Sequence, residues 1–248
     1  YLNFTKSDWK FNRQFCWELC SNGVPMGLQY SITGIGSVVL QSSVNTLGEV
    51  VVAAVTAGTK IGCFAGCPLD AMGSTMATYG GQNVGAKRLD RVHEGMLSCI
   101  KLGIIYSIIA FSFMLLFGEK LALLFVDGTE TELIHYTYLY LLGSTGFFIP
   151  LTLVNIVRFM IQGLGYSSLA ICAGICEMIA RGFVGVCLVP AYGYLFVPLA
   201  GPIAWILADL FLIPAYLHVL KQLEINLYGK RQLQYSMNPF RKNVKRFS

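Results

Sequence analysis

The longest uncharged run in the sequence limits the environments in which this chain can fold. Residues 19–48 contain no Asp, Glu, Lys or Arg. A helix needs about 20 residues to cross a hydrocarbon core of about 30 Å, and this run is longer than that. We therefore expect a membrane-spanning helix from about Glu18 to Leu47, with some tilt or with one end in water.

The composition of the whole chain supports a lipid environment. Of its 248 residues 55% are hydrophobic and only 12% are charged, and the mean hydropathy is +0.60. These values exclude an ordinary soluble domain. The net charge of +5 comes from basic residues gathered at span ends and in the stretch after Lys221. It therefore indicates membrane sidedness rather than nucleic-acid binding.

Five further apolar stretches bring the number of predicted spans to six. We expect the second to bend at Pro68, because proline removes a backbone hydrogen bond inside a helix. The five stretches cover about residues 50–79, 97–117, 136–162, 167–189 and 199–220. Between them we expect turns at Gly80–Gly85, Gly163–Gly165 and Pro190–Pro198, and an acidic loop at Gly118–Glu132.

The charges between the spans predict the orientation of the chain. Basic residues collect before the first span, after the second and after the sixth, whereas acids collect between the third and the fourth. By the positive-inside rule we expect a plasma-membrane protein with both ends in the cytoplasm. Residues 17–225 would form the six-helix domain. Residues 1–16 would be an amphipathic surface segment or a plain linker, and residues 226–248 a basic cytoplasmic tail, lipid-bound or solvated.

Three pairs of cysteines are spaced four residues apart, which places both thiols of a pair on one helix face. They are Cys16/Cys20, Cys63/Cys67 and Cys172/Cys176. The three histidines are scattered, and a zinc site would need a convergent histidine or a second pair. We therefore expect these cysteines to pack as small apolar side chains rather than to bind a metal. The sequence also shows no Walker motif, and we expect no cofactor.

Ionisable side chains inside the spans are the candidate functional residues, because each costs roughly 2.5 to 3.5 kcal/mol at the centre of a bilayer. At about 1.5 Å per residue, Asp70, Glu177 and Asp209 fall near the midplane on three different helices. Arg181 lies one helical turn after Glu177 and can pair with it. Arg158 lies near the end of its helix, where it either snorkels to the interface or reaches Glu177.

Each candidate also has a purely structural interpretation. Glu177 and Arg181 either form a structural ion pair or handle substrate and protons, and Asp70 and Asp209 have no obvious cationic partner in the sequence. Uncharged polar residues inside the spans are expected to form hydrogen bonds between helices, with lining of a transport path as the alternative. These residues are Gln29, Asn45, Asn155 and Gln162.

Motifs near the start of the chain carry a resemblance to a known family. They are Gly23-Val24-Pro25, Leu47-Gly48 and Gln82-Asn83-Val84-Gly85-Ala86. In their order they resemble the multidrug and toxic compound extrusion (MATE) transporters, in which such motifs mark the start of each six-helix lobe. The resemblance covers nearly all of the chain. It implies an all-α, polytopic membrane protein whose six transmembrane helices form the C-terminal lobe of a two-lobe transporter.

The resemblance further implies ion-coupled export of amphipathic, cationic small molecules. Sodium-coupled members carry acids in the first and fourth helices of this lobe, but the matching positions, near Gly34 and over Tyr136–Val157, hold none. This favours the proton-coupled, DinF-like branch, whose key aspartate lies in the N-terminal lobe and outside this chain. The expected partners are a drug-like substrate, H+ (or Na+), the lipid bilayer and the missing N-terminal lobe, but not nucleic acid.

Other classes of function stay open. A flippase for lipid-linked precursors, from the same superfamily, would need several basic residues in its cavity to hold pyrophosphate, and only Arg158 and Arg181 qualify. An enzyme would need a nucleophile, base or metal constellation at membrane depth, and the sequence offers none. A membrane protein without transport activity is the remaining alternative.

Overall fold

The computed structural model describes residues 12–125 and 130–229, and this part of the chain is helical without strands. The longer helices are α1 (Arg13–Val44), α2 (Glu49–Gly85), α3 (Leu89–Ala122), α4 (Thr131–Thr145), α5 (Phe148–Gly163), α6 (Ser167–Phe183) and α8 (Ala200–Tyr228). Short helical turns join some of them: η1 (Asn45–Leu47), η2 (Val184–Leu188), α7 (Val189–Tyr192) and η3 (Gly193–Phe196). The predicted all-α fold is confirmed.

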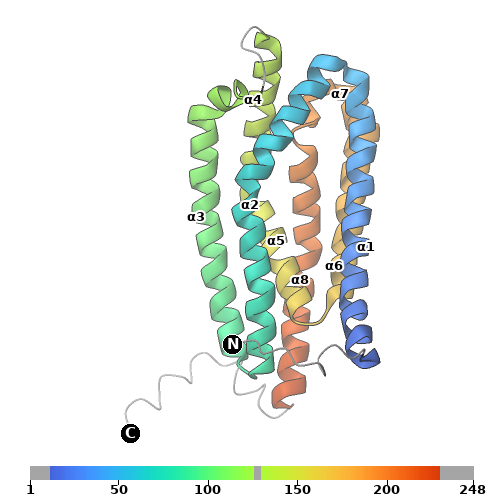
Figure 1. The fold of residues 1–248 in the computed structure, drawn as a ribbon, viewed down its shortest axis with the longest axis vertical. Helices are drawn as coiled ribbons and strands as arrows, with labels where there is room; N and C mark the ends of the chain where they lie inside the picture. Colours follow the sequence, from blue (N-terminus) through green and yellow to red (C-terminus); the bar gives the residue numbers. More distant parts are fainter. Residues whose placement is uncertain (1–11, 126–129, 230–248) are drawn as a thin grey trace.

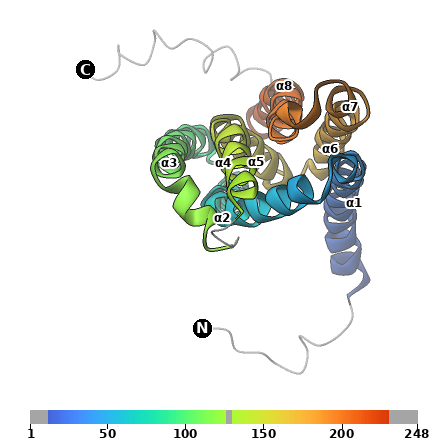
Figure 2. The ribbon, with the colours of Figure 1, turned by 90° about the horizontal axis from the view of Figure 1, so that it is seen from above.

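The longer helices of the described chain make six segments, if α4 and α5 are taken as one. These segments lie side by side (Figures 1 and 2). Within the described ranges, α2, α3, Ser167–Phe196 and Ala200–Leu227 are each long and apolar enough to cross a membrane. The pair α4 and α5 makes a fifth such span. Helix α1 is long enough at 32 residues but is less apolar than the other spans, because Gly, Ser, Thr and Gln interrupt its apolar residues.

The outer surface of α3 shows why this bundle belongs in lipid. Large apolar side chains project from it, and Leu102, Ile109 and Leu116 are 60%, 61% and 72% exposed. Extended apolar surface of this kind is unfavourable in water and is rare on soluble monomers. In hydrocarbon it carries no such cost. The described helices therefore form a multi-pass membrane bundle.

Helix α5 is the centre of the bundle. It packs against α2, α3, α6 and α8, and it lies in the middle of the bundle when the molecule is seen from above (Figure 2). Residues 154–158 are all buried. Because every face of this helix meets a neighbour, a charged side chain on α5 is held inside protein and must find its partner there.

The fourth predicted span, residues 136–162, is broken rather than straight. Helix α4 ends at Thr145 and α5 begins at Phe148, and the two are bent by 51°. Pro150 explains the break, because it has no N–H to donate to the carbonyl of Gly146 and its ring would clash there. The break tilts α5 relative to α4 within a single crossing.

The predicted turn at Gly80–Gly85 is wrong. Helix α2 continues through Gly85, and the chain turns at residues 86–88, where Lys87 has a φ of +55°. Gly80 serves packing instead, since a Cβ on it would lie 2.5 Å from the Met160 sulfur. Small residues let two membrane helices approach closely, and here they bring α2 against α5.

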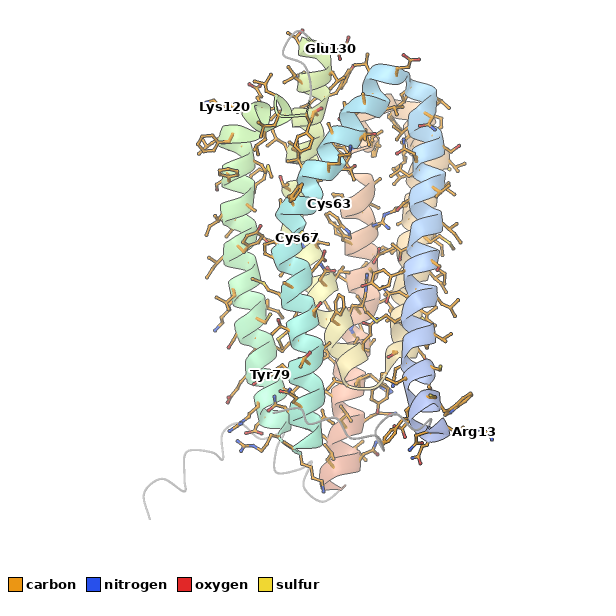
Figure 3. All side chains as sticks on the ribbon, in the orientation of Figure 1. Arg13, Cys63, Cys67, Tyr79, Lys120 and Glu130 are labelled. Carbon is orange, nitrogen blue, oxygen red and sulfur yellow. The ribbon has the colours of Figure 1, made fainter. Side chains whose placement is uncertain are left out.

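Other predicted boundaries are partly confirmed. Figure 1 shows α2 bent, and Figure 3 labels Cys63 at the bend, about one turn before Pro68. The turn at Gly163–Gly165 is present, with a φ of +89° at Gly165. Helix α3 runs to Ala122, so the start of the predicted acidic loop is helical. The turn predicted at Pro190–Pro198 consists largely of the short helical segments α7 and η3.

Two predicted terminal segments and part of one loop lie largely outside the described residues. These are the N-terminal segment up to residue 11, loop residues 126–129 and the basic tail from residue 230. Residues 13–16, which we assigned to the N-terminal segment, begin α1, and residues 226–228, assigned to the tail, are the last turn of α8. Figure 3 shows that Lys120 and Glu130 lie at the opposite end of the bundle from Arg13.

The cysteines do not pack as expected. All eight are free, and Cys20, Cys63, Cys67, Cys172 and Cys187 are exposed while the other three are half-buried. Most of them therefore do not pack inside the described bundle. Within the described residues, no three His, Cys, Asp or Glu side chains gather closely enough to hold a metal ion.

A close contact between α1 and α6 depends on a glycine. A Cβ on Gly36 would lie 2.9 Å from the Cα of Met178, whereas a Cβ on Gly34, two residues earlier in the same helix, would meet nothing within 4 Å. Backbone atoms cannot move aside as a flexible side chain can, so α1 and α6 can be this close only if residue 36 lacks a side chain.

This contact predicts opposite effects for two neighbouring substitutions. Gly36→Ala should destabilise the fold by about 1 to 3 kcal/mol, the usual cost of overpacking. Gly34→Ala should be neutral or stabilising by up to about 1 kcal/mol, because alanine favours helix over glycine. The measurement is the melting temperature of each variant in detergent. Equal shifts for the two variants would contradict the packing described here.

Candidate functional site

A buried carboxylate lies between two arginines near the middle of the bundle. Glu177 of α6 has a side chain only 3% exposed. Its Oε1 accepts a hydrogen bond from Nη2 of Arg158 on α5, and its Oε2 lies 3.3 Å from Nη1 of Arg181, one helical turn further along α6. Arg158 and Arg181 are themselves 9% and 13% exposed. The three charges therefore form an ion triad inside the bundle.

The local helix geometry explains the triad. Glu177 and Arg181 are four residues apart, a spacing that puts both side chains on one face of α6 with the acid on the N-terminal side. Arg158 lies on the central helix, where all of its surroundings are protein. A buried guanidinium needs acceptors, and the carboxylate on the adjacent helix supplies one. The guanidinium thus turns toward α6 instead of snorkelling to the membrane surface.

Asp70 lies on α2 and connects the triad to the surface of the lobe. Its side chain is exposed, and its Oδ1 accepts a hydrogen bond of 2.7 Å from Nδ2 of Asn155. Asn155 precedes Arg158 by three residues, so the two share one face of α5. The positive charge of Arg158 also interacts with Asp70. Asp70 is therefore open on one side and attached to the buried charges on the other.

Asp70 belongs to a polar stripe along α2. Seven exposed residues with small or polar side chains follow each other at intervals of three or four, which places them on one face of the helix. They are Thr56, Thr59, Cys63, Cys67, Asp70, Ser74 and Thr78. A face of this polarity is unfavourable against lipid, so we infer that it adjoins protein or water in the membrane.

Asp209 lies on α8, which packs against both helices of the triad, α5 and α6. The residue is only 8% exposed, and its Oδ1 has no hydrogen-bond partner among the described residues. Arg158 is again the cation that acts on it electrostatically. Arg158 therefore interacts with all three acids, one from each of α2, α6 and α8.

Gln29 extends the polar interior to α1. It is 1% exposed, and its Oε1 accepts a hydrogen bond of 2.8 Å from Nε2 of Gln162. Gln162 lies one helical turn after Arg158 on α5. The hydroxyl of Thr33, one turn after Gln29, is buried without a hydrogen-bond partner in the described ranges. Gln29 thus joins α1 to the central helix but does not touch the ion triad.

The polar interior is incompletely satisfied within the described part of the chain. Six buried atoms lack a hydrogen-bond partner: Thr33 Oγ1, Arg158 Nε, Gln162 Oε1, Arg181 Nη1, Asp209 Oδ1 and Tyr216 Oη. Nη1 of Arg181 is within ion-pair distance of Glu177 but is not aligned for a hydrogen bond. Each such group costs about 1 to 3 kcal/mol. Each such group needs an explanation, and a functional role or a bound water or ion is among the kinds that are known.

The structure brings together most of the predicted site residues. The pairing of Glu177 with Arg181 is confirmed, and of the two alternatives for Arg158 the structure shows the contact with Glu177. The expected hydrogen bonds of Asn155 and Gln162 to other helices are also present. Asp70 differs from the expectation of an interior carboxylate, because it is exposed in this lobe. The unpartnered hydroxyls of Thr33 and Tyr216 were missed, since their spacing does not distinguish them from other span residues.

The triad predicts unequal roles for its two arginines. Arg158→Gln leaves Glu177 with Arg181, the weaker partner, and it also removes the cation that acts on Asp70 and Asp209. The fall in the free energy of unfolding should therefore approach the loss of about 3 to 5 kcal/mol expected when a buried ion pair is broken. Arg181→Gln leaves Glu177 hydrogen-bonded to Arg158 and should cost clearly less. Melting temperatures in detergent compare the two variants. A larger loss for Arg181→Gln would show that Arg158 is not the main partner.

Comparison with known proteins identifies the fold. The family model MatE matches residues 25–186, more than half of the chain. An outward-facing multidrug resistance MATE family transporter of the MOP superfamily matches with a TM-score of 0.80 and 19% identity over 90% of this chain and 50% of its own. A MATE structure in complex with MaL6 matches with a TM-score of 0.77 and 19% identity, covering 89% and 51%.

A MOP superfamily transporter from Pyrococcus furiosus, whose binding pocket is described as having reverse polarity, matches with a TM-score of 0.75 and 18% identity over 91% of this chain and 50% of its own. No curated protein sequence matches. The chain spans about half the length of these solved structures. The resemblance noted in the sequence is thereby confirmed at the level of family and fold, and the chain belongs to the MatE family.

Proposed function

We propose that the chain is the C-terminal lobe of a two-lobe secondary transporter that exports amphipathic, cationic small molecules in exchange for an ion. The ion is a proton rather than sodium. The transporter lies in the plasma membrane with both ends of this chain in the cytoplasm, in keeping with the distribution of basic residues between the spans. The polar stripe on α2 faces the second lobe, and the substrate path runs between the two.

The charge network that opens onto α2 is the observation that carries this proposal. A buried ion triad alone could be structural. Here, however, Asn155 and Arg158 connect the buried charges to Asp70, which is exposed on the polar face. An exposed acid that is electrostatically linked to buried charges can attract a cation and respond to the ionisation of its neighbours.

The proposed preference for protons rests on the sequence. No acid lies in residues 19–48 or 136–157, the regions that correspond to the cation-binding helices of sodium-coupled relatives. A proton needs only one ionisable carboxyl group, whereas a metal ion needs several oxygen ligands at once. The acids of this lobe lie on three separate helices around Arg158, an arrangement that suits single protonation events.

The flippase alternative is less well supported. Its substrates carry pyrophosphate, and binding them requires free cations on the open face. Arg158 and Arg181 both turn toward Glu177 inside the lobe, and the stripe on α2 contributes an acid instead. The network likewise lacks the nucleophile-and-base geometry that an enzyme needs.

The proposal is tested with the complete two-lobe transporter in liposomes. Transport of tetraphenylphosphonium, a lipophilic cation, should follow an imposed proton gradient and should not follow a sodium gradient of equal size. Asp70→Asn should lower the rate at least tenfold, whereas Glu119→Gln, an exposed acid at the outer end of α3, should leave it unchanged. The 248-residue chain alone should insert but not transport. A rate driven equally well by sodium would contradict the proposed coupling ion.

A further inference from the structure

Among the described residues, Asp209 is the acid of the network that has no direct hydrogen-bond or ion-pair partner. Glu177 is held by two arginines and Asp70 accepts a hydrogen bond from Asn155. Oδ1 of Asp209 has no such partner in this part of the chain, although more than nine-tenths of the residue is enclosed by the bundle. Keeping a lone carboxylate away from water is unfavourable, and binding a proton removes the charge.

Two helices of the network pack against α8, namely α5, which carries Arg158, and α6, which carries Glu177 and Arg181. Of these charged groups, Arg158 is the one that acts electrostatically on Asp209. On α8 itself, Tyr216 lies two turns further along, and its buried hydroxyl has no hydrogen-bond partner among the described residues. Glu177 neutralises much of the positive charge of the arginines, so Asp209 receives only part of the compensation that a direct ion pair would supply.

Counting charges shows how Asp209 and Asp70 are linked. The network holds three acids, Asp70, Glu177 and Asp209, and two cations, Arg158 and Arg181. With all groups ionised it carries one negative charge in excess, and a proton on Asp209 makes it neutral. Arg158 interacts with both aspartates, so the charge state of one aspartate changes how strongly the other attracts a cation.

We propose that Asp209 is the proton-binding group of this lobe and that Asp70 contacts the cationic substrate, with Arg158 coupling them so that proton and substrate exclude each other. This proposal deepens the export function proposed above and rests on it. The chemical step is a single proton transfer: an O–H bond of a hydronium ion from the aqueous phase breaks, an O–H bond forms on the Asp209 carboxylate, and water is released, with nothing oxidised or reduced. Proton binding removes the excess negative charge and so lowers the affinity of the Asp70 site for the cationic substrate. The transporter would thereby exchange a proton for the substrate.

The test uses the complete transporter in detergent and measures equilibrium binding rather than transport. Tetraphenylphosphonium is titrated between pH 5 and pH 8, and proton release on binding is followed in weakly buffered solution. Affinity should fall by about 5- to 150-fold toward low pH, the usual range for coupled sites. Reciprocity then requires that binding of the cation release protons near the midpoint of this change.

Three variants identify the residues involved. Asp209→Asn should bind tetraphenylphosphonium with an affinity that no longer depends on pH, and binding should release no protons. Asp70→Asn should lose at least tenfold in affinity at pH 8. Glu119→Gln, which lies outside the network, should behave as the unaltered protein does. Gel filtration shows whether each variant is folded. If Asp209→Asn does not fold, Asp209→Glu replaces it in the test. This variant retains a carboxyl group in an altered position and should shift the pH midpoint of proton release.

Three results would overturn the inference. They are pH-independent binding by the unaltered protein, undiminished proton release by Asp209→Asn, and an unchanged midpoint in Asp209→Glu. The failure of the export function would look different, because binding would still release protons while no gradient drove efflux. Efflux in the presence of pH-independent binding would remove this inference and leave the export function in place.

Discussion

The burial of Arg158 is the constraint on which the polar interior of this lobe depends. A guanidinium on the central helix of a membrane bundle cannot reach water and cannot lose its charge, so acceptors must come from neighbouring helices. Glu177 supplies the direct contact from α6, while Asp70 on α2 and Asp209 on α8 lie within its electrostatic reach. One side chain thereby links four of the helices.

The packing of the bundle supports this arrangement. Pro150 breaks the fourth segment and tilts α5 by 51° relative to α4, and Gly80 allows close contact between α2 and α5. Gly36 does the same between α1 and α6. These features hold the helices that carry the charges close together. The interior stays polar at its centre, and the outer surface, as on α3, stays apolar toward lipid.

Much of the fold could be predicted from the sequence because the information is local. The uncharged runs, the bend at Pro68 and the pairing of Glu177 with Arg181 each follow from spacing within one segment. Contacts between helices could be suggested but not decided: Arg158 had two possible environments, and Asp70 and Asp209 had no visible partner. The turn predicted at Gly80–Gly85 failed because glycine serves both turns and close packing, and only the neighbouring helix distinguishes the two.

The most direct measurement of the central role of Arg158 is a double-mutant cycle with Glu177. If the two side chains form the main contact of the network, Arg158→Gln and Glu177→Gln should each lower the melting temperature in detergent. The double variant should then be more stable than the sum of the two losses predicts, with an interaction energy of about 1 to 3 kcal/mol. Simple additivity would show that the two charges do not depend on each other, and it would contradict this account of the lobe.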